Sequence, residues 1–470
     1  MGRFLYLRDG MANKNPATLE LASRLRAAGH EVAFASHRDI SKAVESEGFS
    51  FHHLNSDRAL ADKAQAAPAP TLSNVAALWR WLRLRRSLRA QSLRHTEVED
   101  LIARIKPDLL LIDVECHYFI IAASETSVPI ALPMLWFSIF RHSGLPPLNS
   151  KLQPGNGWRA QFTISLSWLR VRAGALRDRL ATTYGRHALA DLLRPVPYNA
   201  KGVRNLKSLA RAKGFDWRAK TSRSHWLRPF VYPHLPTLCL NARESEFPHI
   251  PSASVHYVGP MIRAAKTGCN DRGSSDPQWR RFQSHRAQKN NSSRPLIYCS
   301  LGSFWNLDVD FLQKVIHVFR KRTDWDLALG LGGAGREMCI DEAPDNVFVF
   351  DWAPQRELLQ HADCTISHGG VSSINECLAS AVPMLIYSAK KVDQNGNAAR
   401  IAYHELGLCA DKDTDSAEDI EANIETCLAS AEFKENLAQM KDTLEKYKAE
   451  NVAIRILENL AQRKPSARPI

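Results

Sequence analysis

The feature that most constrains the fold of this chain is a β-strand, a glycine turn and a helix in direct succession near residue 370. Cys364–Ser367 is a short β-prone segment, His368-Gly369-Gly370 follows it, and Ser372-Ser373 open an apolar helix. A turn of this kind leaves backbone N–H groups and the positive end of the helix dipole free to hold an anion, most often a phosphate. The sequence therefore predicts an α/β domain with an anion site at this turn.

Residues suited to a nucleotide-sugar surround the turn, all within 352–400. Trp352 offers a flat face for a base, and His368 adds a donor beside the backbone N–H groups. Glu376 lies one helical turn further on, where its carboxylate can accept both ribose hydroxyls. The pair Asp393-Gln394 precedes another helix and suits sugar hydroxyls. Together they predict a nucleotide-sugar pocket.

This stretch resembles the donor-binding signature of the UDP-glycosyltransferase family (glycosyltransferase family 1), in its bacterial macrolide and carotenoid branch. The matching residues are Trp352, Ala353, Pro354, Gln355, His368, Gly369, Gly370, Ser373, Glu376, Val382, Pro383, Asp393, Gln394 and Asn397. One departure is Ala381, where the family usually has glycine. The resemblance implies a GT-B fold, in which two Rossmann-like, doubly wound parallel-sheet domains face a cleft. It also implies that Ser372 and the turn at Gly302-Ser303 contact the donor.

The length and hydropathy pattern support two α/β domains. The 470 residues are 44% hydrophobic, which is enough for two cores. Short apolar strands alternate with helices, as in the βαβ unit formed by Phe4–Leu7, a helix opened by Pro16, and Glu31–Ala35. We expect an N-terminal acceptor domain at 1–258, a linker at 259–294, a nucleotide-sugar domain at 295–445, a C-terminal helix at 446–462 that packs back on the N-terminal domain, and a disordered tail at 463–470.

The chain shows no sequence signal for a membrane-spanning helix, a secretory leader or a metal site. Mean hydropathy is −0.30, and Arg3, Arg8 and Asp9 interrupt the first residues. The nine cysteines are scattered without a CxxC pair, which favours reduced thiols in a cytoplasmic protein. We expect no cofactor beyond the donor substrate.

Positive charge is concentrated in the N-terminal half. Residues 1–250 hold 36 Lys and Arg against 20 Asp and Glu, and residues 151–230 hold 17 against 3. Aromatic and basic residues are mixed in 78–94 and 158–180. This mixture is suited to binding the anionic inner surface of a membrane. The alternative is that the apolar side chains are core and the arginines solvated. No nucleic-acid-binding motif accompanies the charge.

The general base is the open question. In the family, a histidine usually stands three residues before the proline that opens the first helix, and an aspartate after a later strand orients it. Here the histidine position is Asn13, which cannot act as a base, whereas the aspartate position is Asp113. Another group could serve, such as Asp9, Asp113, Glu115 or His117. Otherwise the acceptor is already nucleophilic, or the protein binds donor without turnover.

The resemblance therefore implies an inverting, metal-independent hexosyltransferase that moves glucose from UDP-glucose to a hydrophobic or lipid-like acceptor. Trp136, Phe137 and Phe140 are candidates to line the acceptor pocket. The alternative is a catalytically silent UDP-sugar-binding protein of the same fold.

Overall fold

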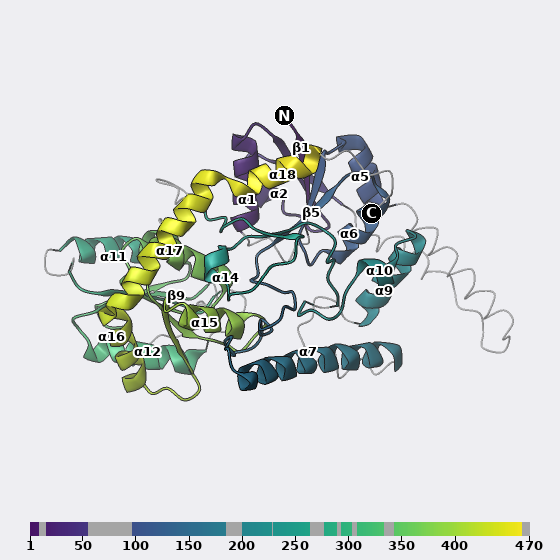
Figure 1. Ribbon diagram of the computed structural model, residues 1–470. Coiled ribbons are helices and arrows are strands. Elements are labelled where there is room, and N and C mark those ends of the chain that lie inside the picture. The colour runs from purple at the N-terminus through teal and green to yellow at the C-terminus, as the bar shows by residue number, and fades with distance from the viewer. Residues whose placement is uncertain are drawn as a thin grey trace, which may run out of the picture.

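The chain forms two α/β domains that lie side by side (Figure 1). The computed structural model describes residues 1–8, 16–54, 96–184, 200–227, 229–263, 277–288, 293–302, 308–332 and 343–462. Asn13, Ser303, the basic stretch 78–94 and the tail 463–470 lie outside these residues. None of the described helices combines the length and apolar character that a membrane span needs.

The N-terminal domain is built on a seven-stranded parallel sheet with strand order β3-β2-β1-β4-β5-β6-β7. Its strands are β1 (Arg3–Arg8), β2 (Glu31–Ser36), β3 (Ser50–His53), β4 (Leu109–Ile112), β5 (Ile130–Met134), β6 (Thr237–Cys239) and β7 (Val255–Tyr257). Continuous burial along β1, β4 and β5 reflects coverage of the sheet on both faces. The hydropathy pattern predicts four strands in this half, and the structure confirms them as β1, β2, β4 and β5. The predicted ranges are Phe4–Leu7, Glu31–Ala35, Leu109–Asp113 and Pro129–Leu132.

Helices cover both faces of this sheet and extend from it. They are α1 (Pro16–Ala27), α2 (Ser41–Glu45), α5 (Glu97–Ile105), α6 (His117–Ala122), α7 (Trp158–Tyr184), α9 (Ala200–Ala212) and α10 (Trp217–Lys220), with short 3-10 turns at Ala123–Glu125 and Arg243–Ser245. α1 begins at Pro16, whose fixed φ suits the first helical position. A capping box between Thr96 and Glu99 fixes the start of α5.

The C-terminal domain contains a six-stranded parallel sheet with order β10-β9-β8-β11-β12-β13, the arrangement of doubly wound dinucleotide-binding domains. Its strands are β8 (Leu296–Ser300), β9 (Asp326–Gly330), β10 (Val347–Phe350), β11 (Cys364–Ser367), β12 (Met384–Tyr387) and β13 (Gly407–Ala410). Its helices are α11 (Pro277–Ala287), α12 (Val309–Lys321), α13 (Gln355–Leu359), α14 (Val371–Ser380), α15 (Gln394–Tyr403), α16 (Ala417–Ala429) and α17 (Ala431–Glu450).

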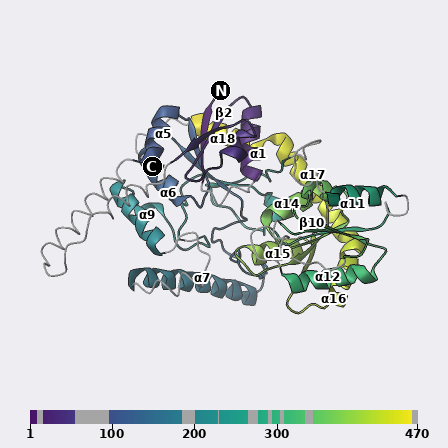
Figure 2. The same ribbon diagram turned by 180° about the vertical axis from the view of Figure 1, so that it is seen from behind.

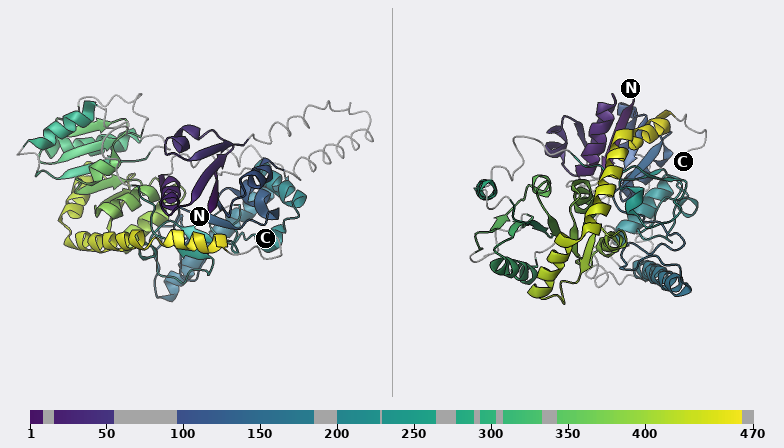
Figure 3. Two further views of the ribbon diagram at one scale, coloured as in Figure 1. Left: turned by 90° about the horizontal axis from the view of Figure 1, so that it is seen from above. Right: turned by 60° about the vertical axis from the view of Figure 1, so that its left-hand side comes forward.

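The last helix, α18 (Val452–Gln462), returns to the N-terminal domain. Figure 3 shows α17 and α18 as a yellow rod that runs from one domain to the other. Asn451, with φ of 50°, separates the two helices. Ile454 and Leu457 of α18 join the core beneath β1, and His30 Nε2 lies 3.0 Å from Glu458 Oε1. The chain end therefore ties the two domains together.

Two of the expected domain boundaries differ from the structure. The linker expected at 259–294 contains α11, because Trp279 and Phe282 pack into the core of the C-terminal domain with Phe348. The boundary expected at 445/446 falls inside α17, where Leu437 and Leu444 bury one helix face against the same core. At both boundaries, the buried apolar face of a helix extends the C-terminal domain into a stretch whose polar composition had suggested a linker or a domain end.

Candidate functional site

The candidate donor site lies where the strand order of the C-terminal sheet reverses. β8 lies between β9 and β11, and Ser300 pairs with Ser367 at the carboxyl ends of β8 and β11. Ligands of open α/β sheets bind outside the strands at this switch point. The loops that follow both strands meet here, since a Cβ atom built on Gly302 would lie 2.6 Å from His368 Cε1. Gly302 also has φ of 86°, which side chains rarely adopt. Both the close contact with His368 and the backbone conformation therefore require glycine at this position.

The glycine turn after β11 leads directly into α14. Gly369 has φ of 82°, and Gly370 is the N-cap with φ of −69° and ψ of 132°. Because Gly370 has no side chain to cap the helix, the N–H groups of the first turn face outward for a ligand. The amide of Asn397 in α15 donates to Gly369 O at 2.9 Å and holds the turn in place.

His368 lies against this turn. A Cβ atom on Gly370 would lie 2.7 Å from its Nε2, so the ring and the turn are closely packed. Burial lowers the pKa of His368 to about 4, although a hydrogen bond with the backbone of Ser300 raises this pKa in part. Its Nδ1 is buried and has no hydrogen-bond partner among the described residues. The ring is therefore neutral near pH 7 and offers one N–H.

Glu376 occupies the next turn of α14 and is held by two neighbours. Gln355 Nε2 donates to its Oε2 at 2.5 Å, and Arg356 Nε lies 3.7 Å from its Oε1. Tyr298 Oη donates to Gln355 Oε1 at 3.0 Å and continues the network into the sheet. Burial raises the pKa of Glu376, while Arg356 and then Gln355 lower it. The predicted ribose carboxylate thus lies in a preorganised polar network.

Trp352 follows β10 at the carboxyl edge of the C-terminal sheet. Its side chain is 40% exposed, which fits a stacking surface better than a core position. The next residue, Ala353, is packed tightly, because a Cβ atom on Gly330 would lie 3.0 Å from its own Cβ. The two neighbours therefore have different environments, and only Trp352 presents a ring to solvent.

Asp393 and Gln394 lie at the start of α15. Asn397 Nδ2 donates to Asp393 Oδ2 at 2.7 Å, and burial raises the pKa of Asp393. Gln394 is 4% exposed, and its Oε1 accepts from Lys391 N at 3.4 Å. Figure 2 shows α14 and α15 on the side of their domain that faces the N-terminal domain. The start of α15, with Asp393 and Gln394, is therefore close to the domain interface.

A small crevice lies between the two domains at α14. It is lined by Pro16, Ala17, Leu135, Leu240, Pro260, Met261, Ile262, Arg263, Ser372, Asn375 and Glu376. The start of α1 and the start of α14 therefore open on the same space. Asn375, which the sequence did not single out, bridges the domains there by donating to Asn241 Oδ1 at 2.8 Å. Only its position next to Glu376 in the sequence could have marked Asn375 as a residue of this site.

Comparison with known proteins agrees with this architecture. Residues 324–459 match the family model described as the C-terminal domain of erythromycin biosynthesis protein CIII-like proteins. Demethyllactenocin mycarosyltransferase of Streptomyces fradiae is 28% identical over 205 residues, which are 44% of this chain and 41% of that protein. Within these matched residues, the chain is similar to macrolide-type glycosyltransferases. The matches to the first curated relatives span less than half of their lengths.

Solved structures of glycosyltransferases share the whole GT-B fold with this chain. The glycosyltransferase of kitacinnamycin has 20% sequence identity and a TM-score of 0.64, over 98% of this chain and 99% of that one. The glycosyltransferase VinC, solved in complex with DTDP, has 20% identity and a TM-score of 0.55, over 98% and 100%. At these identities the likeness establishes the expected two-domain fold.

In the N-terminal domain, Asp113 is the first of the predicted base candidates. The residue follows β4 at the carboxyl edge of its sheet, beside β1. Tyr6 Oη donates to Asp113 Oδ1 at 2.7 Å, and Arg8 Nε lies 3.5 Å from Oδ2. Burial and the charge of Asp113 raise the pKa of Tyr6 well above its usual value, so the phenol stays a donor. Asp113 is thus held as an oriented carboxylate.

The other candidates on this side have different environments. Glu115 is half-buried in the turn after Asp113. His117 was expected to be able to reach an acceptor, but it is fully buried: its ring lies 4.5 Å from that of Phe230, and Nδ1 is 3.2 Å from Tyr232 Oη. His117 begins α6, whose apolar face turns into the core. That placement removes it as a candidate base.

The expected aromatic lining of the acceptor pocket also needs correction. Phe137 and Phe140 are almost completely buried in the core of the N-terminal domain. The Arg400 guanidinium lies 5.0 Å from the Phe137 ring, so this side chain serves the domain interface instead. Trp136 is half-buried and meets Trp226 edge-on at 5.2 Å. Among the three aromatic residues, only Trp136 retains an exposed part.

Proposed function

We propose that this chain is an inverting glycosyltransferase that moves a hexose from a UDP-sugar to a hydrophobic acceptor. The observation that carries the proposal is the glycine turn after β11, where His368 packs against Gly302 and Gly370 and α14 begins. A nucleotide diphosphate fits this turn because backbone N–H groups and the helix dipole meet its negative charge. Glucose is the proposed hexose by family resemblance.

In the transfer step, an acceptor oxygen attacks the anomeric carbon as the bond from that carbon to the diphosphate oxygen breaks. The electron pair leaves with UDP, and attack from the opposite face inverts the anomeric configuration. The first turn of α14 and the neutral His368 ring donate hydrogen bonds to the leaving diphosphate. This electrostatic assistance allows the leaving group to depart without a metal ion.

The acceptor proton passes to a base, for which Asp113 is our candidate. Its carboxylate is oriented by Tyr6 and lies beside Arg8, at the carboxyl edge of the sheet that faces the donor domain. A directly acting carboxylate would compensate for Asn13 at the usual histidine position. An acceptor that is already ionised, such as a carboxylic acid, would need no base.

A silent UDP-sugar-binding protein is the second candidate, and Asn13 is the observation that favours it. Both candidates bind donor through α14 and differ only in turnover. We retain both UDP- and dTDP-sugars as donors to be compared, because VinC was solved with DTDP.

The experiment is a product screen with the purified chain. UDP-glucose, UDP-galactose, UDP-glucuronate and dTDP-glucose are each combined with lipid extracts, hydrophobic alcohols, acids and amines, and products are identified by mass. We expect one hexosylated product, lost in His368→Ala and kept in His361→Ala, which removes an exposed histidine outside the site. Tight donor binding without product across the screen would favour the silent binder.

A further inference from the structure

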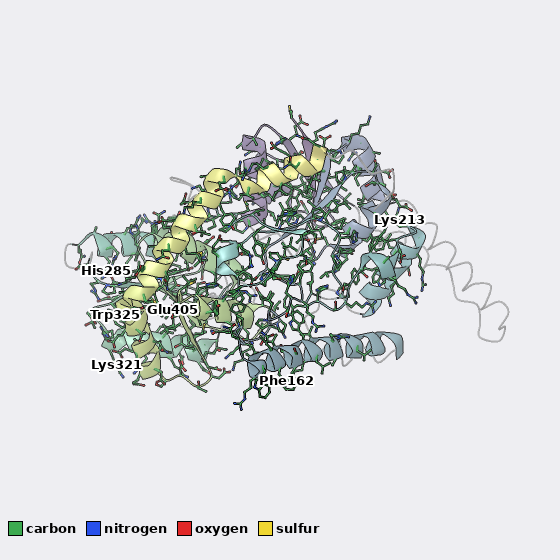
Figure 4. The ribbon with its side chains drawn as sticks, in the orientation of Figure 1. Phe162, Lys213, His285, Lys321, Trp325 and Glu405 are labelled. Atoms are coloured by element: carbon green, nitrogen blue, oxygen red, sulfur yellow. The ribbon has the colours of Figure 1, made fainter. Side chains whose placement is uncertain are left out.

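The outer face of α7 carries large apolar side chains that are exposed to solvent. The exposed fractions are 74% for Trp158, 64% for Phe162, 38% for Leu166, 57% for Leu169 and 54% for Leu176. With about 100° of rotation per residue, these five lie on one strip about 80° wide. Figure 4 shows Phe162 on α7 at the outer edge of the molecule. We call these five residues the apolar stripe of α7.

The apolar stripe is separate from the face that holds α7 to the protein. Ile164, Trp168 and Val171 lie roughly opposite it and are buried in a small core with Leu152 and Trp226. Trp168 Nε1 donates to Leu145 O at 2.7 Å and fixes the rotation of the helix. The helix is thus already anchored, and its exposed apolar surface is not required for folding.

Arginine side chains flank the apolar stripe. Arg159 and Arg170 lie along one side of it and Arg172 along the other, and all three are exposed. The guanidinium of Arg159 lies 5.4 Å from the centre of the Trp158 ring. The sequence from Trp158 to Arg177 contains no Asp or Glu. An apolar strip between cationic flanks is the pattern of helices that lie in a membrane interface.

We propose that α7 docks this glycosyltransferase-fold protein on the surface of an anionic phospholipid bilayer. The stripe enters the boundary between headgroups and acyl chains, while the arginines contact lipid phosphates. A second copy of the chain is a poorer occupant, because stripe-to-stripe packing would set the arginine flanks of two helices against each other. The exposed side chains argue against the core alternative for 158–180, because Trp168 is the one buried residue among Phe162, Leu166, Trp168 and Leu169.

The test is co-sedimentation of the full chain with phosphatidylcholine vesicles, with and without phosphatidylglycerol. We expect binding only to the anionic vesicles, weakened by salt. The double variant Phe162→Ser/Leu169→Ser should lower the partition coefficient by roughly tenfold or more. Arg159→Gln/Arg170→Gln should lower it by about tenfold and reduce its salt dependence. This readout requires neither donor nor acceptor, so it is independent of the proposed sugar transfer.

The matched control is Ile250→Ser, which removes an 89% exposed apolar side chain outside α7. It should bind vesicles like the wild type, and all variants should share the wild-type unfolding temperature. Equal partition of wild type and Phe162→Ser/Leu169→Ser would overturn the proposal, as would absence of wild-type binding to anionic vesicles. Self-association of the wild type that the double variant abolishes, without vesicle binding, would assign the stripe to a second copy instead.

Discussion

At the residue scale, the candidate donor site contains ionisable side chains whose charge is disfavoured by burial. The pKa of His368 is lowered and the pKa of Glu376 is raised, and in both cases burial is the largest cause. Cavities that disfavour charge strengthen the electrostatic contacts made inside them. A bound diphosphate would therefore interact strongly with the N–H groups of α14.

The lowered pKa of His368 predicts a pH-dependent stability. Between its folded pKa of about 4 and an ordinary value of 6.5, the unfolded chain binds a proton that the folded chain does not. Stability is therefore complete above pH 6.5 and falls as pH decreases toward 4. From pH 6.5 to 5, the free energy of unfolding should fall by about 1–2 kcal/mol more in the wild type than in His368→Asn. Urea titrations at both pH values measure this, and equal losses would contradict it.

The position of Glu376 predicts a role in UDP affinity. Replacement by glutamine keeps the shape but removes the charged acceptor that Gln355 and Arg356 hold in place. The dissociation constant for UDP, measured by calorimetry, should rise by about tenfold or more, as expected for a hydrogen bond to a charged group. Glu435→Gln changes the same charge on an exposed part of α17 and should leave affinity unchanged. Equal affinities for all three proteins would refute the ribose role.

At the element scale, α15 is the helix that joins the donor site to the N-terminal domain. Its start carries Asp393, and one turn from its end Arg400 is completely buried with Glu246 at 2.5 Å. Glu246 also accepts from Ser138 N at 2.7 Å, and His404 Nε2 lies 3.0 Å from Glu246 O. Because one helix carries both features, the position of Asp393 depends on this interdomain ion pair.

Breaking that pair should be strongly destabilising. Arg400→Met leaves the Glu246 carboxylate buried without its counter-charge, which costs about 3–5 kcal/mol. Lys448→Met, which disrupts the exposed pair with Glu445, should cost less than about 1 kcal/mol. Chemical denaturation compares the two variants. A small loss of stability in Arg400→Met would contradict this prediction, because it would show that water reaches the Glu246 carboxylate.

Close packing of α15 against the N-terminal domain gives a second prediction at this scale. A Cβ atom on Gly396 would lie 2.0 Å from Leu148 O, too close for the backbone to remain in place. Gly396→Ala should therefore destabilise the protein by about 1–3 kcal/mol or more, although alanine favours helices. Gly157→Ala, where no atom lies within 4 Å, should be neutral. Thermal unfolding of both variants tests this, and identical transitions would contradict the packing.

At the scale of the whole molecule, two sheets of similar strand order place their carboxyl edges on either side of one crevice. The donor domain supplies the start of α14, and the N-terminal domain supplies the start of α1. α18 adds a second tie between the domains through Ile454 and Leu457. The two halves of the proposed reaction are thereby held at one interface.

The sequence predicted the strands whose whole length is apolar, such as β1 and β4, because burial on both faces leaves a continuous hydrophobic run. It missed β3, β6, β7 and β13, each of which has only three or four residues and so gives a short hydropathy signal. The glycine turn and α14 were predictable because local backbone chemistry defines them. Contacts such as Arg400 with Glu246 were not, since they depend on the docking of two domains. The burial of His117 could not be predicted either, because it depends on tertiary packing.

Acceptor-dependent release of UDP from UDP-glucose measures the proposed sugar transfer itself. We predict slow release from the wild type alone and a large increase with a hydrophobic acceptor, which is lost in His368→Ala and strongly reduced in Asp113→Asn. Calorimetry with UDP would show that the Asp113→Asn protein still binds the nucleotide. If UDP binds tightly but no acceptor ever raises its release above the rate without acceptor, the protein is a binder and the transferase account is wrong.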